Sequence, residues 1–88
     1  MSTIKLNSDQ LEWRDVEGEI VALDLGAREY VSINRTGAAI WPLLVAGATR
    51  DQLAEALVGE FGIDTGAAAN DADAFVGQLA ERGLVHGA

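Results

Sequence analysis

The amino-acid sequence predicts an α+β fold in which a three-stranded antiparallel sheet comes first and three helices follow. Three observations lead to this expectation. Apolar and polar residues alternate over the first third of the chain, apolar residues recur at helical spacing from residue 36 onward, and capping residues separate the helical segments. With 88 residues, the chain is long enough for one compact domain, which we expect to span residues 1–88.

Three segments are expected to form the sheet. Residues 10–14 alternate between apolar and polar, and residues 4–6 form a similar lead-in. Residues 19–25 are mostly apolar and follow a predicted turn at 16–18, and residues 29–34 alternate again. Short turns between consecutive strands favour an antiparallel meander, which leaves its third strand at an edge of the sheet.

The first helix is expected to begin with Thr36 as its N-cap and to end at Gly47. Pro42 lies inside this segment. A proline there removes the hydrogen bond to the Ala38 carbonyl and costs on the order of 3 kcal/mol. The sequence therefore predicts either a kink at this position or a late helix start.

Two further helices are marked by their caps. Residues 49–52, Thr-Arg-Asp-Gln, form a capping box, and Gly62 is expected to cap the far end of that helix. Asp64 or Thr65 then caps the third helix, which closes at residues 82–83. Its expected buried stripe comprises Ala72, Phe75, Val76 and Leu79.

The composition excludes several classes of function. Fourteen acidic residues oppose six scattered basic ones, for a formal charge of −8, which disfavours binding to nucleic acid. Cysteine is absent, so disulfides and thiolate ligands are excluded. No apolar run approaches the roughly 20 residues that cross a bilayer, and the N-terminus does not resemble a signal peptide. We expect a cytoplasmic protein with no membrane partner.

The candidates for catalysis and metal binding are weak. His86 lies in a glycine-flanked tail, where we expect a fraying terminus and a solvated side chain. Asp71 and Asp73 are two residues apart on a helix, so they point in different directions and are not expected to share a metal. The serines have no base to activate them. Burial statistics favour Trp13 and Trp41 as core residues. We therefore expect no enzyme activity, no metal and no cofactor.

Two segments resemble the PqqD-like family, the peptide chaperones of pyrroloquinoline quinone biosynthesis. Residues 32–41, Ser-Ile-Asn-Arg-Thr-Gly-Ala-Ala-Ile-Trp, are similar to the family's strand-to-helix junction. Residues 71–85 are similar to its pattern of Asp, Phe, Leu and a closing Arg/Lys-Gly-Leu. The resemblance extends from about Leu11 to Val85, and the Thr-Gly-Ala-Ala-Ile-Trp form is closest to the stand-alone B proteins of lasso-peptide clusters. It implies a winged helix-turn-helix-like fold.

The resemblance also implies a function as a recognition element for ribosomally made, modified peptides. The leader of a precursor peptide would add to the third strand against the third helix, by β-augmentation. The bound precursor would pass to a separate leader peptidase, a lasso B2-type cysteine protease or another maturation enzyme, and then to a cyclase. The implied site consists of Glu29, Tyr30, Val31, Ser32, Ile33 and Asn34 on the strand and Asp71, Ala74, Phe75 and Gln78 on the helix.

Two of these helix residues have specific expected roles. The small side chain of Ala74 leaves room for a ring or a proline of the leader. Asp71, one turn earlier, is placed to meet a leader lysine. The alternative for Asp71 is an exposed acid near the helix start that the helix dipole favours.

Other classes of protein remain as alternatives. A winged-helix DNA-binding module has the same fold, but it needs basic groups on its recognition helix, where this chain has Asp71 and Asp73. An acyl-carrier-like protein is also small and acidic, but it needs an exposed serine at a helix start. A protein-interaction module unrelated to peptide maturation, structural or of the toxin–antitoxin kind, stays open.

Overall fold

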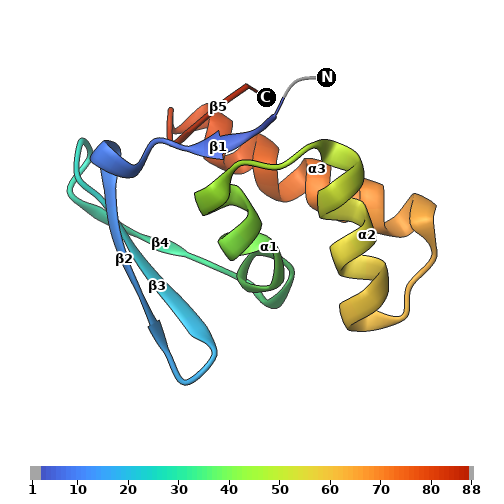
Figure 1. Ribbon diagram of the computed structural model, residues 1–88. Coiled ribbons are helices and arrows are strands. Elements are labelled where there is room, and N and C mark those ends of the chain that lie inside the picture. The colour runs from blue at the N-terminus through green and yellow to red at the C-terminus, as the bar shows by residue number, and fades with distance from the viewer. Residues whose placement is uncertain (1–2, 88) are drawn as a thin grey trace.

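The computed structural model describes residues 3–87 and has the α+β architecture that the sequence predicts (Figure 1). A three-stranded antiparallel sheet is followed by three helices. The elements in chain order are β1 (Lys5–Leu6), the 3-10 helix η1 (Ser8–Gln10), β2 (Leu11–Val16), β3 (Glu19–Asp24), β4 (Glu29–Ser32), α1 (Arg35–Ala46), α2 (Arg50–Phe61), α3 (Thr65–Glu81) and β5 (Val85–His86).

The strands β2, β3 and β4 form the predicted meander in the order β2-β3-β4, so β4 lies at an edge. Glu17 and Gly18 connect β2 to β3 with φ angles of 55° and 85°, and positive φ at both central residues is typical of a type I′ hairpin turn. Between β3 and β4, Asp24 Oδ1 accepts hydrogen bonds from the amides of Gly26 and Ala27. Short turns thus hold all three strands in register.

The lead-in strand β1 does not join this meander. It pairs antiparallel with β5, with Leu6 opposite Val85, and the two ends of the described chain lie side by side (Figure 1). The prediction of a fraying C-terminal tail is therefore wrong for the residues described. The side chain of His86 is exposed, as expected, but its Nδ1 also hydrogen-bonds to Asn7 Oδ1.

The first helix begins earlier than predicted. Its N-cap is Asn34, not Thr36: the backbone of Asn34 is extended, and its Oδ1 accepts a hydrogen bond from the Gly37 amide at 2.8 Å. Thr36 lies inside the helix. Because both residue types are good N-caps, the deciding factor is where β4 ends, and the strand stops two residues before Asn34.

Pro42 lies within α1 without delaying its start. The helix runs from Arg35 to Ala46, so of the two predicted alternatives, a kink or a late start, the late start is wrong. The side chain of Pro42 is exposed. Gly47 ends the helix as predicted, with φ of 94° and its amide donating to the Leu43 carbonyl.

The caps of the other two helices are confirmed. The Thr49 side chain accepts from the Gln52 amide while Gln52 Oε1 accepts from the Thr49 amide, which is the predicted capping box. Gly62 ends α2 in the left-handed conformation, with φ of 65°. Asp64 is the N-cap of α3, and its Oδ1 accepts from the Ala67 amide at 2.8 Å.

The core lies between the helices and the inner face of the sheet. The predicted stripe of α3 is buried in this core. Within residues 3–87, no helix is long and apolar enough to cross a membrane.

Trp41 is buried, with 1% of its surface exposed, but Trp13 is 40% exposed, so the prediction of a core position for Trp13 is wrong. The β2–β3 hairpin extends beyond the helices (Figure 1), and Leu11 is the only buried residue of β2. Trp13 leans on the Trp41 ring with centroids 5.8 Å apart.

Candidate functional site

The open edge of β4 is the first feature of the candidate site, and the register of the sheet shows which of its backbone groups are free. The amide of Leu25 donates to the carbonyl of Gln10 at 3.0 Å, and these residues are opposite each other by continuation of the β2–β3 register. In an antiparallel pair, hydrogen-bonded and non-hydrogen-bonded positions alternate. Val21 and Leu23 therefore bond to β2, whereas Ala22 and Asp24 direct their backbone groups toward β4.

This alternation fixes the orientation of β4. The residues opposite Ala22 and Asp24 are Val31 and Glu29, whose amides and carbonyls consequently bond to β3. The intervening residues, Tyr30 and Ser32, direct their amides and carbonyls away from β3. No strand of residues 3–87 pairs with that side of β4. Tyr30 and Ser32 thus present two free donors and two free acceptors to an incoming strand.

A cavity of about 270 Å³ lies between β4 and α3, beside this edge. Leu79 and Phe75 are buried residues of α3, while Gln78 is exposed on the same helix. The residues that line the cavity are Tyr30, Val31 and Ser32 from the strand and Phe75, Gln78, Leu79 and Arg82 from α3 and its C-cap. Five of the predicted site residues therefore come together here. Leu79 and Arg82 were not predicted, although their spacing of four and seven residues from Phe75 places them on the same helix face.

The other predicted site residues do not line this cavity. Glu29 is exposed at the start of β4. Ile33 and Asn34 lie beyond β4 and line a groove of about 600 Å³ toward the start of α1. This groove adjoins the cavity, because Tyr30, Val31 and Ser32 line both. Asp71 and Ala74 are exposed on α3, in the turns that precede the cavity.

Charged residues lie at one end of the cavity. Arg82 Nη1 lies 3.8 Å from Asp24 Oδ2 and 3.7 Å from Glu29 Oε2. Asp24 is 5% exposed, and its other carboxylate oxygen is already occupied by the turn amides. Arg82 therefore compensates a buried charge while 41% of its side chain stays exposed.

The two aspartates of α3 have different surroundings. Asp73 forms an ion pair with Arg50 of α2. Asp71 is exposed. Within residues 3–87, no three His, Asp or Glu side chains are close enough together to hold a metal ion.

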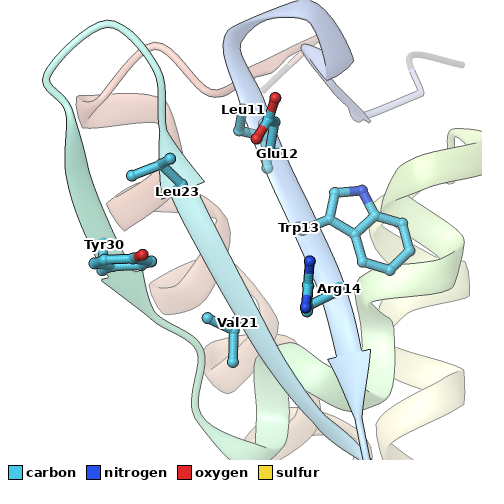
Figure 2. Close-up of a pocket in the computed structure, with 7 residues that line it drawn as sticks. All are labelled: Leu11, Glu12, Trp13, Arg14, Val21, Leu23 and Tyr30. Carbon is cyan, nitrogen blue, oxygen red and sulfur yellow. The ribbon is translucent and has the colours of Figure 1, made fainter.

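The outer face of the sheet carries a second hollow, of about 660 Å³ (Figure 2). Its apolar part crosses from β3 to β4, where Val21, Leu23 and Tyr30 lie on the side away from α3. Glu12 and Arg14 of β2 flank it (Figure 2). The remaining lining residues are Leu11 and Trp13. Tyr30 lies at the border between this hollow and the β4–α3 cavity.

Two solved structures are similar to this chain over nearly its full length. One is described as TbiB1 in complex with the TbiA(beta) leader peptide, with 27% identity, a TM-score of 0.84 and 96% of each chain covered. The other is lasso peptide synthetase B1 complexed with the leader peptide, with 27% identity and a TM-score of 0.78, covering 93% of this chain and 95% of that one. A comparison with curated protein sequences gives no significant match.

The segments that carry the family resemblance also meet in the structure. Trp41, which ends the first segment, packs against Phe75 of the second, with ring centroids 6.4 Å apart in an edge-on arrangement. A family model described as coenzyme PQQ synthesis protein D matches residues 19–85, which is most of the chain. The fold, the two adjoining segments and this match agree, and the chain belongs to the PqqD family.

Proposed function

We propose that this chain binds the leader segment of a ribosomally made precursor peptide and has no catalytic activity of its own. The observation that carries the proposal is the similarity to two structures described as complexes with leader peptides, at 27% identity and with at least 93% of each chain covered. Residues 1–88 would act as one recognition domain.

The proposed mode of binding is addition of the peptide as a fourth strand along β4. The free backbone groups of Tyr30 and Ser32 support it, because a strand edge with unpaired amides and carbonyls is a template for another strand. The β4–α3 cavity supports it as well. Side chains of an added strand that point to the inner face would enter this cavity, where Phe75 and Leu79 offer apolar surface.

The product class we propose is a lasso peptide. Its support is the description of one similar structure as lasso peptide synthetase B1, together with the Thr-Gly-Ala-Ala-Ile-Trp form of residues 36–41. In this proposal the domain holds the precursor for a separate leader peptidase, which removes the leader before a cyclase acts. The chain contributes binding and orientation, and its partner enzymes contribute the chemistry.

Amide hydrogen exchange with and without a synthetic leader tests both the function and the mode. The leader is that of a candidate precursor peptide, to be sought among the genes that neighbour the gene of this chain. The amides of Tyr30 and Ser32 should become protected when the leader binds, because they gain partners. The amides of Glu29 and Val31 should change little, since they already bond to β3. The outward amides of Leu11 and Trp13 on the opposite sheet edge serve as a matched control.

The possible outcomes separate the two parts of the proposal. Protection at Leu11 and Trp13 instead of at Tyr30 and Ser32 would place the peptide on the wrong edge and overturn the binding mode. No calorimetric binding of the leader at all would overturn the function.

A further inference from the structure

We infer that Tyr30 contacts a side chain of the bound peptide on the outer face of the sheet, so that the domain recognises the peptide on both faces of the sheet. The inference rests on the proposed strand pairing at β4. Its starting point is the exposure of Tyr30, which at 75% is the highest among the exposed large hydrophobic residues of the described chain. A tyrosine left this exposed in the middle of a binding edge is available to a partner.

The register determines where a partner residue would lie. The backbone groups of Tyr30 face the open edge, so the peptide residue opposite it forms a hydrogen-bonded pair with it. Directly opposed residues of neighbouring strands have their side chains on the same face, with Cβ atoms about 4.5–5.5 Å apart. The side chain of Tyr30 lies on the outer face, beside that of Leu23 (Figure 2). The opposed peptide side chain therefore also lies on the outer face, in contact with the Tyr30 ring.

The surroundings indicate what kind of side chain this is. Val21, Leu23 and Tyr30 form an apolar patch on the outer face, and the added strand would extend it by one residue. The charged residues that flank the hollow, Glu12 and Arg14, lie on β2, two strands away from the open edge. The peptide residue opposite Tyr30 thus meets an aromatic ring and no charge of that hollow, which favours an aliphatic or aromatic side chain.

Alternation then separates the two kinds of contact along the peptide. The immediate neighbours of the residue opposite Tyr30 point to the inner face, toward the β4–α3 cavity. Tyr30 would therefore contact one peptide position, and cavity residues such as Gln78 would contact the positions directly before and after it. A peptide with apolar residues only at every second position would make apolar contacts on one face of the sheet and none on the other.

A second copy of this chain is another conceivable occupant of the same edge. Two copies would have to pair through β4 with a formal charge of −8 each, and like charges disfavour such pairing. A leader that carries lysines has the opposite charge. The peptide is accordingly the occupant that the electrostatics favour, and sedimentation of the free protein distinguishes the two.

The experiment is a set of double-mutant cycles between the domain and an alanine scan of the synthetic leader, measured by calorimetry. Tyr30→Thr keeps a residue that favours β-strands and removes the ring. This substitution should lower the affinity for the parent leader about fivefold, which is about 1 kcal/mol. This loss should vanish when one particular leader residue is alanine. The loss of affinity caused by Gln78→Ala should instead vanish when an immediate neighbour of that leader residue is alanine. Val16→Thr is the control, since Val16 is exposed on the outer face of β2, far from the open edge, and should leave affinity unchanged.

Equal affinity of the parent and Tyr30→Thr for the leader would overturn the inference while leaving strand pairing intact, provided the amides of Tyr30 and Ser32 are still protected. Coupling of Tyr30 and Gln78 to the same leader residue would overturn it too, because one side chain cannot lie on both faces. If the free protein is a dimer and Tyr30→Thr makes it monomeric, the partner of Tyr30 is a second copy of this chain, which would also overturn the inference. Failure of the parent protein to bind any leader is a different result, which rejects the proposed function itself.

Discussion

The ring of Phe75 lies so close to the backbone of Gly37 that a Cβ atom on Gly37 would overlap three of its carbons. Gly37 is buried in the first turn of α1, and Phe75 is buried in α3, where it lines the β4–α3 cavity. The absence of a side chain at Gly37 therefore lets α1 approach α3 directly behind the candidate site. The position of the Phe75 ring depends on that approach.

Gly37→Ala is expected to destabilise the protein by about 1–3 kcal/mol, because it overpacks a filled core. Alanine is intrinsically about 1 kcal/mol better than glycine in a helix, but the overlap with Phe75 outweighs this gain. Displacement of the ring should also weaken leader binding. Urea denaturation gives the change in stability, and calorimetry at a temperature where the variant is folded gives the change in affinity.

Gly59→Ala is the matched control. Gly59 is exposed in α2, and a Cβ atom there would meet nothing within 4 Å. This variant should be more stable than the parent by about 0.5–1 kcal/mol, through the helix propensity alone. If Gly37→Ala and Gly59→Ala shift the denaturation midpoint in the same direction, the packing of Gly37 against Phe75 is not as tight as described.

Local signals were sufficient to predict most of the elements. The capping box at Thr49 and the glycine at the end of each of the first two helices depend on residues a few positions apart, and both were predicted correctly. The cap of α1 was not, since Asn34 and Thr36 are each suitable and the end of β4 decides between them. That decision depends on how far β4 pairs with β3, and the last pair, Val21 with Ser32, lies beyond the reach of a local capping pattern.

The errors elsewhere have the same origin. The pairing of β1 with β5 joins the two ends of the described chain, and no local pattern indicates it. Trp13 alternates like a core residue, but only the first residue of β2 is buried. At the site, helical spacing from Phe75 could have indicated Arg82 as a cavity residue. Its contacts with Asp24 and Glu29 could not be predicted in this way. Such a charge network depends on tertiary structure.

Duplex DNA should not bind to this protein. Phosphate contacts require basic side chains, and α3, the helix that would read DNA in a winged-helix protein, carries Asp71 and Asp73. A formal charge of −8 adds repulsion. Fluorescence anisotropy with a labelled duplex should show no binding at low salt, where electrostatic attraction is strongest. Sub-micromolar binding there would contradict the proposed function.

Ala74→Trp should weaken leader binding, if the peptide continues along α3 past the cavity. Ala74 is exposed and lies outside the buried stripe, so the larger side chain obstructs the peptide path without disturbing the core. We expect at least a tenfold loss of affinity, about 1.4 kcal/mol. Calorimetry measures the loss, and the melting temperature should stay close to that of the parent.

Ala80→Trp provides the comparison for this variant. Ala80 is exposed on the same helix, six residues further along, which places it on a different face from Ala74. The same increase in size at Ala80 should leave the affinity unchanged. A folded Ala74→Trp variant that binds the leader as tightly as Ala80→Trp would show that the peptide does not run past Ala74.

Asp71 should contribute a salt-dependent attraction to lysines of the leader. It is exposed on α3, and an exposed ion pair contributes about 0.2–1 kcal/mol, so Asp71→Asn should lower the affinity by up to about fivefold at low salt. The difference should shrink as salt is added, because the Debye length falls from about 10 Å at 0.1 M to about 3 Å at 1 M. Asp73→Asn removes the same charge from the same helix, but the Asp73 carboxylate is engaged by Arg50. Its effect on calorimetric affinity should therefore be smaller. Equal losses for the two variants would mean that the leader responds to the net charge of the domain and not to Asp71.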